Sequence, residues 1–432
     1  MFKKSFLIPF LCSSVLTSGA VPSELFSSLI PTKVLATFKA LPSPIQYPQY
    51  TDQTAGDWLY FNPSTWTSGF FPATLYALNT RKQLCGATPA NALSIADWLS
   101  LGRSASNGLL SVTTANGVGH DVGFISYPFV EELAINPKNQ TAINAVNKYA
   151  TELAARFDPV VGCTRSWDTA DPTDFQVIID NMMNLEVLFH SADLTGNNTL
   201  RQIAKTHADT TMKNHFRPDG SSTWHVVEYN STTGAVIKKR TAQGYADNST
   251  WSRGQAWAIY GYANMHKFTN DQNYLATARK AATYFLTHLP ADGVVPWDFN
   301  APLTPPPRPA DSSAATIVVN GLLLLAQQET SVVSKQLWID GALRILNSIT
   351  ALAWKPSWQS LLSNGTVNWP ANNFLTGIVY GTGHSFLSGP SRSHHRPVVL
   401  RVGDYYYIRA GNELVSMGLA SCHSPFAAPN SS

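Results

Sequence analysis

The sequence predicts an all-α fold in which neighbouring helices pair into a toroid with an inner and an outer ring. Apolar residues recur at helical spacing in one segment after another, whereas the alternation typical of half-buried strands is sparse. The intervening segments are long and rich in Trp, Asp, Gly and Pro, and such loops in a compact domain are usually functional. Helical periodicity alone leaves an irregular helical bundle open as the alternative.

The helical periodicity extends through most of the chain. Helices are expected at 66–80, 89–103, 124–136, 139–157, 180–195, 199–214, 252–269, 272–289, 312–329 and 334–353, with further ones at 374–381 and 404–419. Gly196-Asn197 and Pro290 follow expected helix ends, and Asp311 is a candidate N-cap. In a toroid the long loops at 104–121, 158–178, 215–251 and 292–311 would converge at one end and build a cleft.

The composition excludes some classes of function. Charged residues make up 13% of the 432 residues and the net charge is +3, so the basic surface typical of nucleic-acid binding is not expected. The 12 Trp are a weak indication of sugar binding, because Trp also fills ordinary cores. No Cys or His spacing suggests a metal site, and neither a metal nor an organic cofactor is expected.

The N-terminus has the pattern of a secretory signal peptide. Lys3 and Lys4 precede an apolar run at 6–16 that is too short for a membrane span, and Ser18-Gly19-Ala20 offers small residues for cleavage. The predicted organisation is a signal peptide at 1–20, an N-terminal extension at 21–49, a large domain at 50–420 and a tail at 421–432. We expect a secreted monomer with no membrane contact after signal cleavage.

Cysteines and glycosylation sequons agree with secretion. After removal of the signal peptide three cysteines remain, Cys85, Cys163 and Cys422, which allow one disulfide and one free thiol. The sequence does not decide which two form the pair. Asn-x-Ser/Thr sequons occur at Asn139, Asn197, Asn230, Asn248, Asn364 and Asn430, and they support a secreted glycoprotein only mildly because such triplets also arise by chance.

Asp121 and Asp180 each stand where a loop meets an expected helix. A carboxylate at this position is often only an N-cap, because it accepts hydrogen bonds from the free N–H groups of the first turn. Asp180, however, lies between isoleucine and methionine pairs, and burial among apolar groups would raise its pKa above the usual value of about 3.9. The helix N-terminus would lower the same pKa. Asp180 is therefore either a cap or an acid that keeps its proton.

The densest group of candidate binding residues lies between 224 and 257. On a helix Arg253 and Trp257 are four residues apart and project from one face. A fixed guanidinium beside an indole suits a carboxylated sugar, since the cation binds polar groups and the ring packs against carbons. A stacked Arg–Trp pair with a purely structural role is the alternative. His225 and Trp66, taken alone, could equally be core residues.

Together and in this order the motifs resemble glycoside hydrolase family 88, the unsaturated glucuronyl hydrolases. The resemblance covers roughly 50–420, and the Arg-Gly-Gln-Ala-Trp block is its most specific part. The matching segments are Trp66-Thr67-Ser68-Gly69-Phe70, His120-Asp121-Val122-Gly123-Phe124, Asp180-Asn181-Met182-Met183-Asn184-Leu185, Gln243-Gly244, Trp251-Ser252-Arg253-Gly254-Gln255-Ala256-Trp257, Pro296-Trp297-Asp298-Phe299 and Gly403-Asp404-Tyr405-Tyr406. The resemblance implies an (α/α)6 barrel, a toroid of six helical hairpins with long active-site loops.

The resemblance also implies an activity and a set of site residues. The expected reaction removes a 4,5-unsaturated glucuronic acid from the non-reducing end of lyase-generated oligosaccharides by hydration of the C4=C5 double bond. Asp180 would be the general acid/base and Asp121 the second catalytic carboxylate. The sugar subsite would be lined by Trp66, His225, Thr241, Gln243, Arg253 and Trp257. Related unsaturated rhamnogalacturonyl hydrolases, which share this chemistry, and a non-catalytic glycan-binding barrel are the alternatives.

The chain departs from the family pattern in two places. Lys239 stands where the family usually has Gly, two residues before Thr241, and its side chain would narrow the neighbouring subsite or add a cation. The segment 382–403 is basic, rich in Ser, Gly and Pro and without helical periodicity, and it separates Gly381 from Asp404. Its removal would restore a Tyr-Gly-Asp-Tyr-Tyr run, so we expect an insertion or a translated intron rather than a functional loop.

Overall fold

The computed structural model describes residues 19–52, 55–113, 117–303, 309–363 and 401–422. The described helices are α1 (Leu29–Lys39), α2 (Phe70–Cys85), α3 (Trp98–Ser106), α4 (Val122–Ile135), α5 (Gln140–Ala154), α6 (Glu186–Thr195), α7 (Asn198–His215), α8 (Ser252–Thr269), α9 (Gln272–His288), α10 (Ser312–Gln328), α11 (Val332–Ala353) and α12 (Arg401–Ser416). The predicted helix at 374–381 lies outside the described residues.

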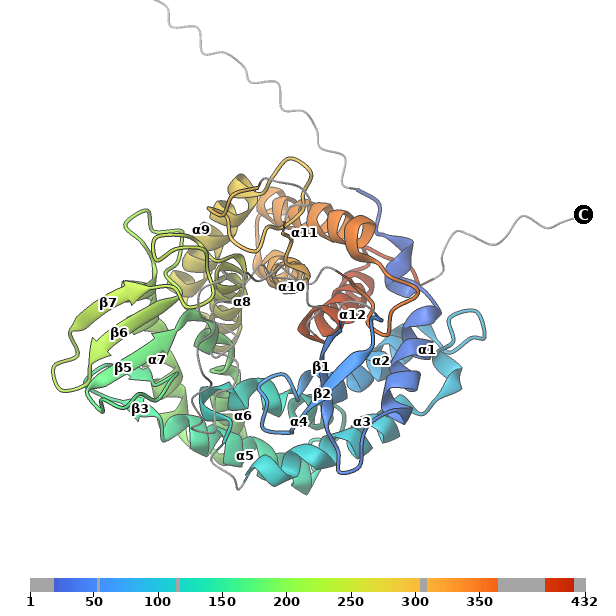
Figure 1. Ribbon diagram of the computed structural model, residues 1–432, viewed down its shortest axis with the longest axis horizontal. Helices are drawn as coiled ribbons and strands as arrows, with labels where there is room; N and C mark the ends of the chain where they lie inside the picture. The colour runs from blue at the N-terminus through green and yellow to red at the C-terminus, as the bar shows by residue number, and fades with distance from the viewer. Residues whose placement is uncertain (1–18, 53–54, 114–116, 304–308, 364–400, 423–432) are drawn as a thin grey trace, which may run out of the picture.

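The helices form two concentric rings, as the sequence predicted (Figure 1). The even-numbered helices from α2 to α12 each contact the next one, and α12 contacts α2, which closes the inner ring. The odd-numbered helices lie outside them. Inner helices such as α8 and α10 are buried along almost their whole length. The outer helix α5 buries only a stripe at helical spacing, from Ala142 to Leu153.

The two ends of the barrel differ in the length of their connections. At one end short segments, 136–139, 196–197, 270–271 and 329–331, join α4, α6, α8 and α10 to the next outer helix. Gly196 and Asn270 end helices there with positive φ values of 73° and 57°. At the other end the inner helices begin, after long segments such as 107–121, 155–185, 216–251 and 289–311. The predicted convergence of the long loops is therefore observed.

The long loops contain strands that periodicity did not predict. β5 (Asp174–Ile178), β6 (Val226–Asn230) and β7 (Val236–Arg240) form an antiparallel sheet in that order, at the left of Figure 1. β1 (Tyr47–Thr51) pairs with β2 (Trp58–Phe61), and β3 (Phe157–Asp158) pairs with β4 (Cys163–Thr164). The expected helix at 180–195 is also divided, into the 3-10 helix η5 (Ile179–Met183) and α6.

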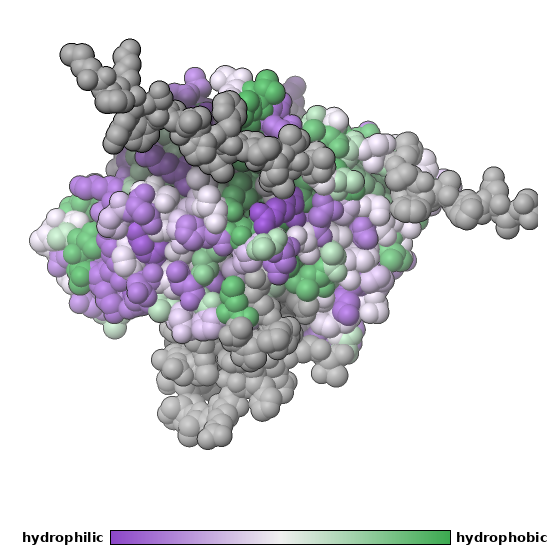
Figure 2. Space-filling model, turned by 90° about the horizontal axis from the view of Figure 1, so that it is seen from above, coloured by the Kyte–Doolittle hydropathy of each residue, from purple (hydrophilic) through white to green (hydrophobic). Residues whose placement is uncertain are grey.

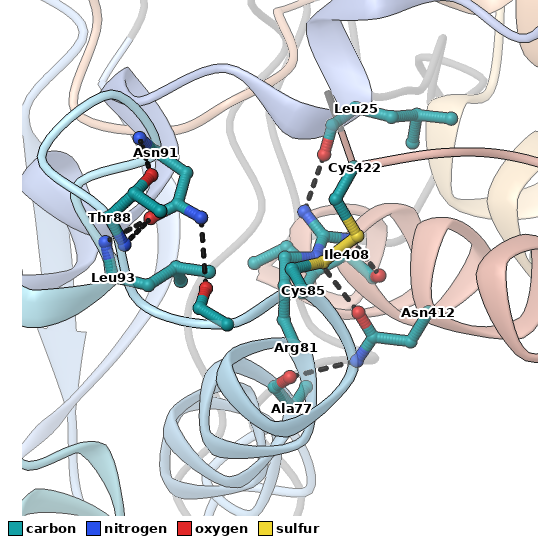
Figure 3. The surroundings of a disulfide bond; sticks show 11 residues. Leu25, Ala77, Arg81, Cys85, Thr88, Asn91, Leu93, Ile408, Asn412 and Cys422 are labelled. Carbon is teal, nitrogen blue, oxygen red and sulfur yellow. Dashed lines mark hydrogen bonds between the residues drawn. A yellow bond between two sulfur atoms is a disulfide. The ribbon is translucent and has the colours of Figure 1, made fainter. Parts of the chain in front are cut away.

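The segment 21–49, expected as an extension, packs against the barrel. Leu25, Ile30 and Val34 are buried in the main core, and α1 contacts α2. The C-terminal segment also returns to α2, because Cys422 forms a disulfide with Cys85 (Figure 3). This settles the cysteine pairing that the sequence left open, and Cys163 is the buried free thiol.

Buried polar contacts around Arg81 hold the same junction (Figure 3). Its guanidinium donates to the carbonyl oxygens of Leu25 and Ile408 and to Asn412 Oδ1. Arg81 thereby joins α2 to the N-terminal segment and to α12.

Among the described residues no helix is long and apolar enough to cross a membrane. Figure 2 shows hydrophobic residues in small areas, separated by hydrophilic ones.

Candidate active site

The inner helices begin close together at the long-loop end. A Cβ added to Gly69, just before α2, would lie 2.1 Å from the carbonyl oxygen of Phe124 in α4. A Cβ on Gly123 would lie 2.4 Å from the Cα of Asn184, just before α6. Glycine at these positions therefore permits the close approach of α2, α4 and α6. The two aspartates lie at this junction.

Asp121 ends the short 3-10 helix η4 (Gly119–Asp121) and directly precedes α4. Its carboxylate makes no capping hydrogen bond to α4, so the N-cap alternative does not describe it. One carboxylate oxygen lies 3.2 Å from His120 Nε2, and its side chain is 20% exposed. Asn184 accepts a hydrogen bond from the backbone N–H of Phe124 through Oδ1. This bond fixes the amide beside Asp121.

Asp180 lies on η5, directly after strand β5, and is buried with 8% of its surface exposed. The N-cap residue of η5 is Ile178, so Asp180 lies inside this helix and does not cap it. Its Oδ1 is buried and, among the described residues, has no hydrogen-bond partner; His225 Nε2 is 3.7 Å away. Buried polar atoms are normally satisfied, so such an atom in a native site is typical of a position that a ligand or water completes.

Burial raises the pKa of both carboxyl groups. The pKa of Asp180 rises to about 7 through burial, against the opposing charge of Arg253 and the nearby indole of Trp257. The pKa of Asp121 rises to about 8 through burial and through the negative charge of Asp180, against the opposing effect of Asn184 and Arg156. Below about pH 7 both carboxyl groups therefore keep their protons, and a protonated Asp180 is what general-acid catalysis requires.

His225 is held by the loop that follows β7. Its Nδ1 accepts hydrogen bonds from the backbone N–H groups of Ala242 and Gln243, at 3.1 and 3.2 Å. Burial, followed by the charges of Arg240 and Arg253, keeps the pKa of His225 well below its usual value. The ring is therefore neutral, and its proton sits on Nε2, the atom that faces Asp180.

Arg253 is less free than the sequence suggested. Its Nη2 donates to Gln243 Oε1 at 2.7 Å and its Nη1 donates to Ser313 Oγ at 3.1 Å. Nη1 also lies 3.5 Å from the fully buried carboxylate of Asp311. The guanidinium stacks over Trp251, 4.7 Å from the ring centroid, so the ring it stacks on is not Trp257, the partner in the stacked-pair alternative. Arg253 is thus held in place by protein groups.

Aromatic rings form a continuous row beside the carboxylates. Trp66 packs edge-on against Phe124 with centroids 5.6 Å apart, and Phe124 lies 5.2 Å from Trp257. Trp257 is fully buried, and its Nε1 has no hydrogen-bond partner within the described part of the chain. Trp66 is only partly buried, so of the two it is better placed to pack against a sugar.

The loop that carries Thr241 and Gln243 is anchored by a residue to which the sequence assigned no role. Asp298 Oδ2 accepts hydrogen bonds from the backbone N–H of Tyr245 and from Ser249 Oγ. Thr241 Oγ1 accepts from the backbone N–H of Gly244 at 2.7 Å. The signal for Asp298 was its place in the Pro-Trp-Asp-Phe motif, while nothing in the sequence linked it to this loop.

Lys239 and Arg240, consecutive residues of β7, lie on opposite faces of the sheet. The charge of Arg240 acts on His225, whereas that of Lys239 acts on His215 of α7. Arg240 is thus a further cation beside His225, and the expectation that Lys239 narrows the subsite or adds a cation there stays a prediction. Among the described residues no group of His, Cys, Asp and Glu is arranged to hold a metal ion.

Comparisons with known proteins identify the family of the chain. No protein-family model matches the chain. An unsaturated glucuronyl hydrolase of Formosa agariphila is 39% identical over 340 residues, which cover 76% of this chain and 80% of the relative. One from Bacillus sp. strain GL1 is 35% identical and covers 54% of this chain and 61% of the relative.

A solved structure agrees over almost the whole length. The crystal structure of an unsaturated glucuronyl hydrolase specific for heparin has a TM-score of 0.77 and 27% identity, and the match covers 93% of this chain and 98% of that one. The two rings of helices are therefore the (α/α)6 barrel that the resemblance implied. The chain belongs to the unsaturated glucuronyl hydrolases of glycoside hydrolase family 88.

Proposed function

We propose that the protein releases 4,5-unsaturated glucuronic acid from the non-reducing end of oligosaccharides produced by polysaccharide lyases. The observation that carries this proposal is the pair of buried Asp180 and half-buried Asp121 where the inner helices begin, both with raised pKa values. A glycan-binding barrel without activity would not require such a pair. Family membership favours a glucuronyl over a rhamnogalacturonyl substrate.

The C4=C5 bond of the substrate is an enol ether, so C4 is basic enough to accept a proton from a positioned acid. Asp180 donates this proton to C4, and the positive charge that forms is shared by C5 and the ring oxygen. The Asp180 carboxylate then takes a proton from a water that attacks C5. The resulting hemiketal opens and the glycosidic bond breaks without attack at C1, unlike the usual two-carboxylate displacement.

The neighbouring residues support this sequence of steps. The neutral His225 presents an N–H toward Asp180 and stabilises its carboxylate after proton transfer. Trp66 offers a ring for sugar packing, and Thr241, Gln243 and Arg253 belong to the hydrogen-bonded wall beside it. Trp257 contributes a buried indole N–H close to Asp180. These assignments of binding residues are part of the proposal.

Loss of ultraviolet absorbance tests the activity directly, since the double bond conjugated to the carboxylate absorbs and its hydration removes the signal. We expect turnover of unsaturated disaccharides that carry a glucuronyl group, prepared from several polysaccharides. Turnover restricted to unsaturated galacturonyl-rhamnose would favour the rhamnogalacturonyl alternative. Saturable binding with no absorbance loss on any substrate would favour a glycan-binding barrel.

We further infer that the protein is secreted and glycosylated. The support is the N-terminal pattern at 1–20 and the Cys85–Cys422 disulfide, which is typical of oxidising compartments. Among the sequons in the described residues, Asn197 and Asn248 are exposed, whereas the Asn139 amide is hydrogen-bonded to Glu132 and Ala142. Mass spectrometry of protein from the culture medium should find glycans at Asn248 before Asn139; unmodified protein confined to cells would contradict this.

A further inference from the structure

His120 is a buried residue beside the catalytic pair for which the proposed mechanism has no use. Its Nδ1 lies 2.7 Å from the backbone carbonyl oxygen of Ser166. A carbonyl oxygen only accepts hydrogen bonds, so the ring proton must be on Nδ1. Burial, followed by the charge of Arg156, lowers the pKa of His120 to about 3, so the ring is neutral. Nε2 is therefore a bare acceptor.

That bare nitrogen faces Asp121 at 3.2 Å from Oδ1. His120 Nε2 is buried and, within the described residues, no donor is assigned to it. Two acceptors at this distance repel each other unless a proton lies between them, and because the buried ring is neutral, the carboxyl group is the partner that carries it. An O–H of Asp121 that donates to His120 Nε2 satisfies both atoms.

We propose that His120 is a positioning residue that holds a proton on Asp121, so that Asp180 ionises first and Asp121 remains a neutral hydrogen-bond donor. Only the consequence for turnover rests on the proposed function. The contact between His120 Nε2 and Asp121 Oδ1 does not involve the substrate.

In the second histidine–carboxylate pair, His225 and Asp180, the hydrogen-bond roles are reversed, because here the histidine is the donor. His225 Nδ1 accepts two backbone N–H groups, so its Nε2 carries the proton and faces Asp180 Oδ1 at 3.7 Å. A donor favours the charged form of a carboxyl group and an acceptor favours its protonated form. Backbone groups thus set a different tautomer for each histidine. As a result one aspartate, Asp121, keeps its proton while the other, Asp180, loses it.

The charged and titratable groups around the pair agree with this order. Asp180 from η5 acts on Asp121, Arg156 from the end of α5 acts on both His120 and Asp121, and His207 from α7 is influenced by His120. Arg156 also donates to the Ser166 carbonyl at 3.2 Å and so supports its position. Burial raises the pKa of both carboxyl groups, and the negative charge of Asp180 raises that of Asp121 further.

A neutral Asp121 changes one step of the mechanism. The substrate carries its own carboxylate, and a second negative charge beside it would weaken binding. A protonated Asp121 avoids this repulsion while Asp180 alternates between acid and base. Asp121 then acts through hydrogen bonding, and not as the negatively charged second carboxylate that the resemblance implied.

Carbon-13 NMR of protein labelled at the aspartate side-chain carboxyl carbons tests the order without any substrate. Asp121→Asn and Asp180→Asn assign the two signals. Because Asp121 is still neutral when Asp180 ionises, Asp121→Asn should leave the Asp180 midpoint in place. Asp180→Asn removes a negative charge and should lower the Asp121 midpoint. The reverse pattern, with the Asp180 midpoint lowered by Asp121→Asn, would overturn the proposal.

Variants of His120 test the role of the histidine itself. His120→Phe removes the acceptor and should lower the Asp121 midpoint, whereas His120→Gln can accept through its amide oxygen and should restore it. The exposed His288→Gln on α9 is the matched control. An unchanged Asp121 midpoint in His120→Phe would overturn the assignment to His120, and if that variant does not fold, the two aspartate variants still decide the order. The readout requires no turnover, so loss of the proposed activity would be recognised separately.

Discussion

The two ends of the barrel are made from the same inner helices but differ in how their buried polar groups are hydrogen-bonded. At the short-connection end Glu132, near the end of α4, accepts hydrogen bonds from Tyr76, Arg103 and Asn139. At the long-loop end Asp180 Oδ1 and Trp257 Nε1 are buried and have no hydrogen-bond partner within the described residues. The first arrangement stabilises a fold, and the second leaves positions for a substrate to complete.

The largest expected effect is at the long-loop end. Asp180→Asn removes only the transferable proton and should lower kcat by about 10²–10⁴-fold, with the fold and substrate binding nearly intact. Absorbance kinetics on an unsaturated disaccharide measure this loss, and the exposed Asp193→Asn on α6 serves as control. Activity within a few-fold of wild type would remove Asp180 from the mechanism.

A change at the short-connection end should affect stability and leave catalysis unchanged. Glu132→Ala leaves its three donors without their acceptor, and we expect a loss of roughly 2–4 kcal/mol in the free energy of unfolding. Denaturant unfolding measures the loss, and Glu132→Gln, which retains an acceptor oxygen, should recover part of it. A large fall in kcat for folded Glu132→Ala would contradict the view that this end of the barrel contributes to stability and not to catalysis.

The pH dependence of stability sharpens the same contrast. Burial raises the folded-state pKa of Asp121 and Asp180, so their protonated forms favour the fold below about pH 4. This contribution is lost as the pH rises through about 7 to 8. Asp180→Asn should therefore raise the melting temperature relative to wild type at pH 9 and not at pH 4. An equal difference at both values would contradict the raised pKa.

The smallest effect is expected from removal of 382–403, of which 382–400 lies outside the described residues. The remainder begins α12, where Val402 is fully buried and a Cβ on Gly403 would lie 3.3 Å from Ser312 Oγ. Deletion would place Gly381 where Gly403 stands, so the glycine is kept. We expect unchanged or higher melting temperature and activity. Deletion of 382–400, which leaves α12 intact, is the comparison; loss of activity in both would identify a functional loop.

Local patterns in the sequence were sufficient for most helices but not for features that depend on distant partners. Buried residues at helical spacing predicted α5, and the same reasoning omitted α1, which lies in the segment assigned to an extension. β5 and β6 pair across a separation that includes α6 and α7, so neither was evident alone. Thr233-Gly234 between β6 and β7 is a turn signal that could have indicated that hairpin.

The candidate site shows the same limit. The motifs brought Asp121, Asp180, His225 and Arg253 into one hypothesis, and the structure places them together. The stacking of Arg253 on Trp251 instead of Trp257 depends on the backbone turn before α8, which spacing along a helix cannot reveal. The orientation of His120 depends on the carbonyl of Ser166, a residue far away in the sequence.

The disulfide between Cys85 and Cys422 joins the first inner helix to the segment that follows the last one, over a sequence separation of 337. A cross-link over so long a loop restricts the unfolded chain, which in the chain-entropy model is worth roughly 6 kcal/mol. Its position has a second consequence. With this bond intact α12 cannot separate from α2, so unfolding must begin at another helix–helix contact of the ring. Under reducing conditions this covalent link is lost, and the ring can also open between α2 and α12.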